Sequence, residues 1–398
     1  MTLRVHRKDY PSGEMVVLGE SEAIGIAEVQ NALSGLWRKA SEQQQQSGSQ
    51  AVSLACLWNL VAFHGNPHPR RQDSGGEAHR IQDLLQQVTL SLPARVIHLE
   101  QRRAAEAQEA GKEVEAWVNT CCVHTSGGAR MVCCEEIHLA GYGKKGHSHF
   151  PALVRALLVP DLPTALLWLD DMQPEGRVLS ELLELSDRII IDNQQSTDPA
   201  SLSAVKGLLD ANPGKVVDLG WLRLNPLRHL LADFFDPPGR AEQLARMEHI
   251  VIDGSAEGRN IGLLLLGWLL SRCGYREVRA LEPGEGGDAY RWQAADGKKA
   301  LSVDFQVREG YGGMDGIFRI EIQAAGDTFS LTDVDPEHMA MKGPDHDRPS
   351  VALREADEPE LVVRALGGKG TDPIYGEALA MGAELVAATR GKSEQRNP

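Results

Sequence analysis

The chain has 398 residues, of which 42% are hydrophobic and 24% are charged, a length and composition that suit two or three globular domains. Its net charge of −15 is spread along the chain, which favours solubility and argues against nucleic acid or an anionic membrane as the main partner. The N-terminal segment has no secretory signal, the longest apolar run (261–270) is far shorter than the ~20 residues of a membrane span, and six cysteines are too few for a disulfide scaffold. We therefore expect a cytoplasmic protein.

The first 50 residues predict a helix followed by a linker. Apolar residues recur at helical spacing over 21–40, among them Val29, Leu33 and Leu36. The polar, low-complexity run SEQQQQSGSQ at 41–50 predicts an exposed linker.

Residues 51–145 predict an N-terminal α/β region that contains a hairpin. The expected elements are a strand at 52–64, a helix at 77–90, a strand at 95–100, and paired strands at 113–125 and 130–140. Gly127 and Gly128 lie between the last two strands, and glycine supplies the positive φ that a two-residue hairpin turn requires.

Residues 146–283 alternate between helices and strands. Helices are expected at 151–158, 175–186, 199–211, 222–235 and 257–273, and strands at 164–170, 188–192, 215–219, 249–253 and 277–281. Short apolar strands between longer helices predict βαβ units and a mostly parallel sheet with flanking helices.

The pattern changes to a smaller, β-rich unit over 284–398. Strands are expected around Trp292 and at 301–308, 316–323 and 328–331, with turns rich in Gly and Asp, and a terminal helix at 373–388. The expected fold class is thus α/β, with a mostly parallel sheet, an antiparallel hairpin near 114–140 and this C-terminal unit.

Four cysteines lie on the two strands of the predicted hairpin. A turn centred on Gly127 and Gly128 pairs residues whose numbers sum to 255, so that Cys121 faces Cys134 and Cys122 faces Cys133. Neighbours along a strand point to opposite faces, so these four thiols cannot surround one zinc ion. Buried apolar thiols and redox-active disulfide pairs both remain open, and we expect no metal site.

A glycine-rich pattern follows the second strand of the hairpin. It matches G-x-G-x-x-G, in which glycines let the backbone approach a dinucleotide's pyrophosphate. The candidate anion-binding residues are Gly141, Gly143, Lys144, Lys145 and Gly146. Against this interpretation, the strand is the second arm of a hairpin, and the acids at 170–171 lie nearly thirty residues on, where the fingerprint has about twenty. A plain connecting loop is the alternative.

Three blocks of sequence resemble a known family. They are CCEEIHL at 133–139, LVRALLVPDLPTALLWLDD at 153–171, and VDLGWLRLNPLR at 217–228, which continues into LLADFFD at 230–236. In content, order and spacing they resemble the glucose-6-phosphate dehydrogenase assembly proteins, and the resemblance spans roughly 52–275.

The resemblance implies a non-catalytic protein that binds glucose-6-phosphate dehydrogenase and promotes its assembly or allosteric activation in the oxidative pentose phosphate pathway. It also implies that thiol redox chemistry can be linked to that control. Trp221, Arg223 and Arg228 lie in the third block, and Trp and Arg are favoured interface anchors, so we take them as candidate partner-binding residues. A core tryptophan with solvated arginines is the alternative for these three.

Two other functions stay open. The sequence contains no G-x-S-x-G, Walker A, H-E-x-x-H or C-x-x-C motif, so we expect no catalytic residue and no cofactor. A nucleotide- or sugar-phosphate-binding enzyme or sensor that uses the loop from Gly141 to His149 is the main alternative. A purely structural partner is the second.

Overall fold

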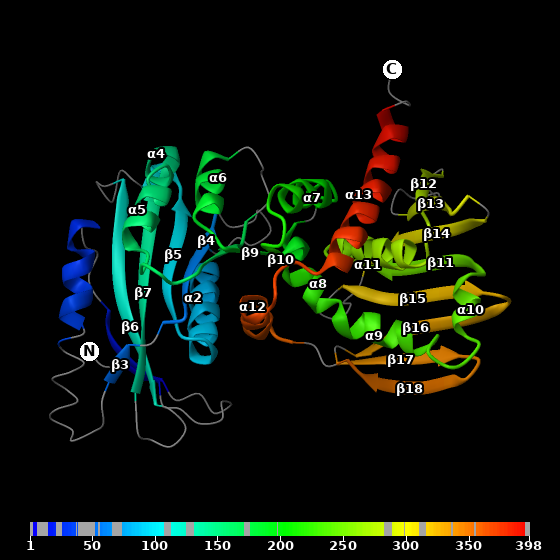
Figure 1. The fold of residues 1–398 in the computed structure, drawn as a ribbon, viewed down its shortest axis with the longest axis horizontal. Helices are drawn as coiled ribbons and strands as arrows, with labels where there is room; N and C mark the ends of the chain where they lie inside the picture. The colour runs from blue at the N-terminus through cyan, green and yellow to red at the C-terminus, as the bar shows by residue number, and fades with distance from the viewer. Residues whose placement is uncertain are drawn as a thin grey trace. The chain divides into compact units, whose positions relative to one another are not determined.

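The computed structural model describes residues 3–5, 15–20, 26–36, 38, 52–54, 56–65, 74–106, 113–124, 131–170, 176–196, 198–281, 289–297, 299–309, 316–335, 337–353 and 356–394. Contacts divide the chain into two compact units (Figure 1). Unit 1 comprises 1–170, 174–191 and 358–368, and unit 2 comprises 171–173, 192–357 and 369–398. The four regions expected from the sequence, with boundaries at 50, 145 and 283, stay predictions.

Unit 1 is built on a mixed sheet whose central strands are parallel. Its strands are β1 (Leu3–Val5), β2 (Met15–Glu20), β3 (Val52–Leu54), β4 (Trp58–His64), β5 (Ala94–Arg102), β6 (Val114–His124), β7 (Met131–Tyr142), β8 (Thr164–Trp168) and β9 (Arg188–Ile191). They lie in the order β1-β2-β6-β7-β5-β4-β8-β9, and β3 also pairs with β7. The pairs from β7 through β9 are parallel, whereas β6 and β7 form the predicted antiparallel hairpin.

The parallel strands β8 and β9 are apolar on both faces, which explains their burial in the sheet. Every residue of β8 is buried, as are the last three residues of β9. Continuous apolar runs of this kind are typical of parallel strands covered by helices on both sides. The expected strand at 52–64 is two strands, because β3 pairs with β7 whereas β4 pairs with β5 and β8.

Helices cover both faces of this sheet. They are α2 (Ser74–Ser91), α4 (Gly143–His147), α5 (Phe150–Leu157), α6 (Arg177–Glu184) and α12 (Glu358–Gly367), with 29–36 also helical. Leu85 of α2 lies near Val96, while Phe150 of α5 packs edge-on against Phe63. Phe63 pairs with Leu99 of β5, so the two side chains lie on the same face of the sheet. Leu99 and Val96 are three residues apart on β5 and therefore point to opposite faces, which places α5 on one face and α2 on the other.

Unit 2 contains a second, mostly antiparallel sheet. Its strands are β11 (Met247–Gly254), β12 (Glu277–Ala280), β13 (Ala289–Ala295), β14 (Ala300–Val307), β15 (Ile317–Ala324), β16 (Asp327–Asp335), β17 (His338–Gly343) and β18 (His346–Ala352). The order is β12-β13-β14-β11-β15-β16-β17-β18, and among these pairs β11 and β14 are parallel. The expectation that 249–253 and 277–281 continue the first sheet is wrong, because both strands pair with the C-terminal strands instead.

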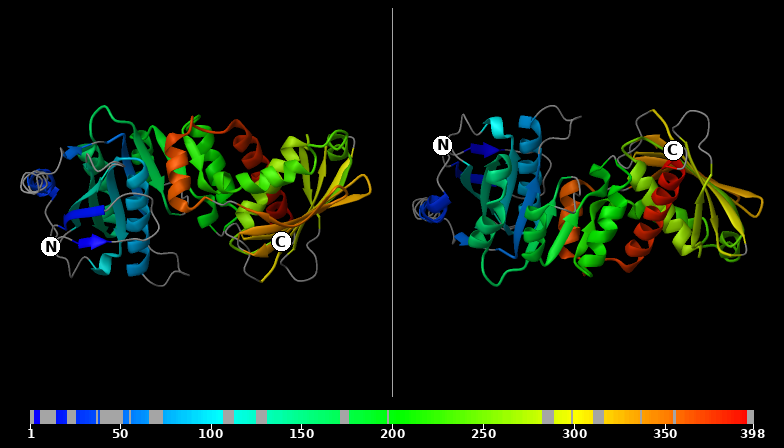
Figure 2. Two further views of the ribbon diagram at one scale, coloured as in Figure 1. Left: turned by 90° about the horizontal axis from the view of Figure 1, so that it is seen from below. Right: turned by 90° about the horizontal axis from the view of Figure 1, so that it is seen from above.

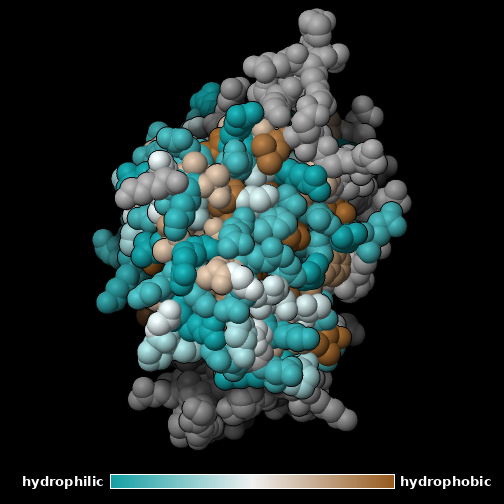
Figure 3. Space-filling view, turned by 90° about the vertical axis from the view of Figure 1, so that its right-hand side faces the viewer, coloured by the Kyte–Doolittle hydropathy of each residue, from teal (hydrophilic) through white to brown (hydrophobic). Residues whose placement is uncertain are grey.

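Helices pack against one face of the second sheet, and the other face is polar. Unit 2 also contains η3 (Asn193–Gln195), α7 (Ser201–Ala211), β10 (Val216–Asp218), α8 (Leu219–Arg223), α9 (Asn225–Asp233), α10 (Ala241–Leu244), α11 (Arg259–Arg272) and α13 (Pro373–Glu394). The ring of Phe305 lies against Gly262 of α11, and the buried Trp292 donates a hydrogen bond to the Leu385 carbonyl of α13 at 2.9 Å. Figure 2 shows α11 and α13 on one side of the sheet, and Figure 3 shows that the opposite face is mostly hydrophilic.

Helix α11 contains the longest apolar run of the sequence. Its buried residues include Ile261, Leu264 and Leu270, which pack inside unit 2. Among the described residues, none of the helices has the length and apolar composition needed to cross a bilayer.

Candidate functional site

The cysteines occupy the register that the sequence predicts. In the β6–β7 hairpin, Cys121 pairs with Cys134 and Cys122 with Cys133 through their Cα positions, which confirms the predicted pairing; the turn at 125–130 lies outside the described residues. Cys133 is disulfide-bonded and Cys134 is a free thiol. Burial raises the pKa of the Cys134 thiol, so little reactive thiolate forms there near neutral pH. That the two pairs act in redox control stays a prediction.

The glycines of the G-x-G-x-x-G pattern are required by packing within unit 1. A Cβ on Gly141 would lie 2.7 Å from the Phe150 ring, and one on Gly146 would lie 2.3 Å from the Glu113 carbonyl oxygen. Gly143 has a φ of +61°, which glycine adopts without strain. The chain thus folds closely onto itself here, and this packing accounts for the three glycines without a ligand.

The basic residues of the same loop differ in whether they contact a carboxylate. Lys145 and His149 both contact the carboxylate of Glu113, with His149 Nε2 at 3.1 Å from Glu113 Oε2. Lys144 forms no ion pair with any residue that the structure describes. Anion binding by this loop stays a prediction, and within the described part of the chain no cluster of His, Cys, Asp and Glu is suited to a metal ion.

The parallel sheet of unit 1 reverses its strand order at β4, since β5 and β7 lie on one side of it and β8 and β9 on the other. Open α/β sheets bind ligands beside the carboxyl ends of the strands at such a point. Here a Cβ on Gly65, which follows β4, would lie 2.1 Å from Asp170 Oδ2, beyond β8. A carboxylate therefore lies where a dinucleotide's phosphate would approach, and it would repel that phosphate.

Three histidines and a tryptophan form a column near the carboxyl end of the same sheet. His64, His98 and His138 lie on β4, β5 and β7, with ring centroids 4.9 Å and 4.5 Å apart, and Trp117 of β6 lies 5.1 Å from His138. His98 Nε2 and His64 Nδ1 are 2.9 Å apart. Burial, and then the charges of His138, His64 and Arg102, hold the pKa of His98 well below its usual range, so its imidazole is neutral.

The charged groups beside this column are paired with one another. Glu100 Oε2 accepts hydrogen bonds from His138 and Arg102, each at 2.9 Å. Burial alone would raise the pKa of Glu100, but these two hydrogen bonds lower it to about 2. The guanidinium of Arg102 also lies 5.5 Å from the Trp117 ring and 5.9 Å from the Tyr142 ring. These groups satisfy each other, which is typical of a structural cluster.

The sequence analysis missed this cluster, although the sequence contains a signal for it. Each of the three parallel strands has a histidine at or beyond its midpoint, in the segments VAFH, VIHLE and EIHLA. Aligning the strands by their carboxyl ends would have placed His98 opposite His138, because each lies four residues before the end of its strand, but not His64, which ends β4.

A buried carboxyl group, Glu136, lies on the face of the sheet that α2 covers. It lines a small pocket with Leu85, Val96 and Cys134, and its side chain is hydrogen-bonded to Asn119. Burial raises the pKa of Glu136 to about 7 from its usual 4.5, a rise that the hydrogen bond from Asn119 only partly offsets.

We expect Glu136→Gln to stabilise unit 1 in a pH-dependent way. Between pH 4.5 and 7 the folded protein retains a proton that the unfolded chain has lost, so rising pH costs wild-type stability across this window. A shift of this size corresponds to about 3 kcal/mol, and burial of the new amide reduces the gain to about 2 kcal/mol. Urea unfolding at pH 5 and pH 8 should show the gain at pH 8 alone, and the exposed control Glu184→Gln should show no such dependence. A gain of equal size at both pH values would contradict this assignment.

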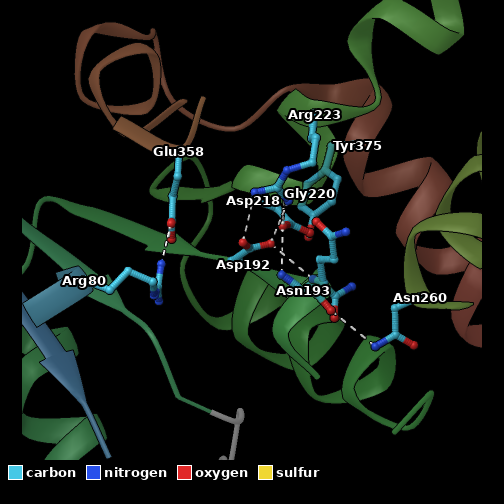
Figure 4. Close-up of polar contacts among 10 residues, drawn as sticks. Arg80, Asp192, Asn193, Asp218, Gly220, Arg223, Asn260, Glu358 and Tyr375 are labelled. Atoms are coloured by element: carbon cyan, nitrogen blue, oxygen red, sulfur yellow. Dashed lines mark hydrogen bonds and ion pairs between the residues drawn. The ribbon is translucent and has the colours of Figure 1, made fainter. Parts of the chain in front are cut away.

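A second buried polar cluster lies in unit 2 (Figure 4). The guanidinium of Arg223 donates two hydrogen bonds to the two oxygens of Asp192, each at 3.1 Å, and the Asp192 side chain is fully buried. Asp218 accepts hydrogen bonds from the Gly220 amide and from the hydroxyl of Tyr375, each at 2.9 Å, so that it caps α8 and holds the start of α13. Burial, and then the charge of Asp192, raise the pKa of Asp218 to about 6.

The structure brings the three partner-binding candidates together in unit 2. Trp221 is buried, with 2% of its surface exposed, and its indole donates a hydrogen bond to Asp372 at 2.9 Å. Arg223 is paired with Asp192, and the guanidinium of Arg228 lies over the Trp221 ring, 3.6 Å from its centroid. Contact of these residues with a partner stays a prediction, and the placement of Trp221 agrees with the alternative of a core tryptophan.

Comparisons with known proteins identify similar families and relatives. Residues 86–206 match the family described as the N-terminal domain of a glucose-6-phosphate dehydrogenase subunit, and residues 214–379 match the family described as the C-terminal domain of such a subunit. A protein of Synechococcus elongatus, described as an OxPP cycle protein OpcA, is 29% identical over 188 residues, which are 47% of this chain and 41% of that protein. The equivalent protein of Synechocystis sp. is 28% identical over 199 residues, 50% of this chain and 41% of its own length. The matched region is thus less than half of either relative.

Among solved structures, an oxidoreductase from Sinorhizobium meliloti is 12% identical, with a TM-score of 0.48 over 86% of this chain and 98% of its own. The transcriptional regulator Gal80p from Kluyveromyces lactis is 10% identical, with a TM-score of 0.47 over 89% of this chain and 96% of its own.

Proposed function

Because the chain belongs to the OpcA family of glucose-6-phosphate dehydrogenase subunits, we propose that it is a non-catalytic partner that promotes the assembly or allosteric activation of that dehydrogenase in the oxidative pentose phosphate pathway. The observation that carries this proposal is the extent of the two matches, which cover 86–206 and 214–379 and so include much of both units. The dehydrogenase is in this proposal the partner of the chain, and the cytoplasm is the expected compartment.

The geometry of unit 1 supports a role without catalysis. Glu100, Arg102 and His138 are engaged with one another, and Asp170 lies against Gly65 at the reversal of strand order. A nucleotide phosphate at this point would meet a carboxylate in place of the open glycine turn that a dinucleotide fold provides. This arrangement disfavours the alternative of a nucleotide-binding enzyme.

Activation of an enzyme by such a partner requires no chemistry from the partner. It requires that the partner bind the active form more tightly than the inactive form, and a difference of about 1–3 kcal/mol changes the ratio of the two forms by about 5- to 150-fold.

The proposal is tested by titrating this protein into the dehydrogenase of the same organism and measuring turnover. We expect a saturable rise in activity of at least several-fold, together with a complex that co-elutes in size-exclusion chromatography. Running the titration under oxidising and reducing conditions also tests the predicted redox pairs, since Cys133 is disulfide-bonded. Absence of both binding and activation under both conditions would contradict the proposal, and binding without any change in turnover would favour the structural alternative.

A further inference from the structure

The side chain of Arg228 is held rigidly at the surface of unit 2 by aromatic rings. Its guanidinium carbon lies 3.6 Å from the centroid of Trp221 and 6.0 Å from that of Trp268 on α11. Its Nη2 donates a hydrogen bond to Asn225 Oδ1, one turn earlier on α9, at 3.1 Å. Stacking on an indole face stabilises the cation and fixes the plane of the guanidinium.

Among the described residues, the positive charge of Arg228 has no ion-paired carboxylate, unlike that of Arg223. Its Nε is buried without a hydrogen-bond acceptor, and within the described residues no carboxylate forms an ion pair with it. Asp372 acts on it electrostatically, but the oxygens of Asp372 accept hydrogen bonds from the Trp221 indole and the Ile374 amide. By contrast, Arg223 has a carboxylate in direct contact.

Burial without a paired carboxylate disfavours the charged form of Arg228. Burial lowers the pKa of its guanidinium to about 10, and the nearby charge of Asp372 only partly offsets this change. A half-buried cation in this condition gains free energy when a carboxylate reaches it, because a charge-assisted, bidentate pair replaces incomplete solvation.

The surroundings of Arg228 suit a single carboxylate on the surface of a protein partner. Asn225 and His229 flank it on the exposed side of α9 at helical spacing. On α8, Arg223 forms an ion pair with Asp192, and on α11, Arg272 forms one with Glu377. One cation between aromatic rings suits a carboxylate, whereas a doubly charged phosphate is held by several donors.

We propose that Arg228 docks a carboxylate side chain of the dehydrogenase, so that Asn225, Arg228 and His229 on α9, with Trp268 on α11, form a contact surface for that enzyme. This inference rests on the proposed function. Stacking on the Trp221 indole preorganises the cation before binding, so less side-chain entropy is lost when the complex forms.

The test compares the affinity of variants for the dehydrogenase, measured by titration calorimetry at two salt concentrations. Arg228→Leu removes the charge and keeps an apolar side chain on Trp221, and we expect it to weaken binding by about 10- to 100-fold and to reduce the salt dependence. Arg228→Lys, which keeps the charge and loses the planar bidentate geometry, should show an intermediate loss. The matched control is Arg390→Leu, which removes an exposed arginine of the same unit and should change affinity by less than about 2-fold.

The outcomes separate this inference from the proposed function and from misfolding. We expect the thermal transition of Arg228→Leu to be no lower than that of the wild type, because the variant removes a cation that lacks a paired carboxylate. If the wild type binds and Arg228→Leu binds equally well, or if both leucine variants lose affinity equally, the inference is wrong and the proposed function stands. If the wild type does not bind, the proposed function itself fails.

A separate experiment tests whether a small anion binds at Arg228. Inorganic phosphate at millimolar concentration should not raise the thermal transition of the wild type more than it raises that of Arg228→Leu. A phosphate-dependent rise in the wild type alone would identify a small-anion site and would overturn the docking assignment.

Discussion

Replacing Gly267 by alanine is expected to destabilise unit 2 by about 3 kcal/mol, the upper part of the usual range for overpacking, and to lower its thermal transition by about 6–12 °C. Gly267 lies on α11, and an added Cβ would lie 2.1 Å from the Ala378 carbonyl oxygen and 2.8 Å from the Gly382 nitrogen. Both atoms belong to the backbone of α13, so no side-chain rotation relieves the clash. The two helices would have to separate and lose packing contacts along their length.

The control for this prediction is Gly207→Ala on α7. Gly207 is exposed, and nothing lies within 4 Å of an added Cβ there. Alanine is the better helix former by about 0.8–1.0 kcal/mol, so this variant should be slightly more stable than the wild type. Differential scanning calorimetry of both variants gives the comparison, and a Gly267→Ala transition at or above that of the wild type would show that α11 and α13 are not in close backbone contact.

The alternation of helices and strands between 151 and 211 was predictable because the local pattern determines it. The strands Thr164–Trp168 and Arg188–Ile191 are short apolar runs with both faces buried, and helices with polar faces separate them. Such runs identify parallel strands regardless of where their neighbours lie in the sequence.

The partners of the later strands could not be predicted in this way. Strand β11 is also a short apolar run, yet Ile250 pairs with Val303 on one side and Ile322 on the other. Both partners come from strands that follow a helix and a change in pattern, and an apolar run does not specify which strand will lie beside it.

The same distinction applies to the candidate sites. The register of Cys122 opposite Cys133 depends on a local turn, so two glycines were enough to predict it. The histidine column depends on the neighbours of β5, because His98 lies opposite His138, forty residues away. Glycine spacing alone does not distinguish a ligand site from close packing at Gly141, where the space beside the Cα is filled by Phe150.

Replacing Arg223 by methionine should destabilise unit 2 by about 4 kcal/mol, because the buried carboxylate of Asp192 loses both hydrogen bonds from the guanidinium. The Asp192 side chain is fully buried and that of Arg223 is 9% exposed, so water cannot easily replace the missing partner. Urea unfolding followed by circular dichroism measures the loss.

The double variant Asp192→Asn with Arg223→Met shows whether the buried charge is the cause. Asparagine keeps an oxygen for the Gln194 amide, which donates to Asp192 Oδ1 at 3.2 Å in the wild type, but it has no charge to leave buried. We therefore expect the double variant to regain at least half of the stability lost by Arg223→Met, since residues of one ion pair are not additive. A double variant less stable than Arg223→Met alone would show that Asp192 contributes through contacts other than this pair. The cluster of Asp192, Asp218 and Tyr375 would then hold the start of α13 without help from Arg223.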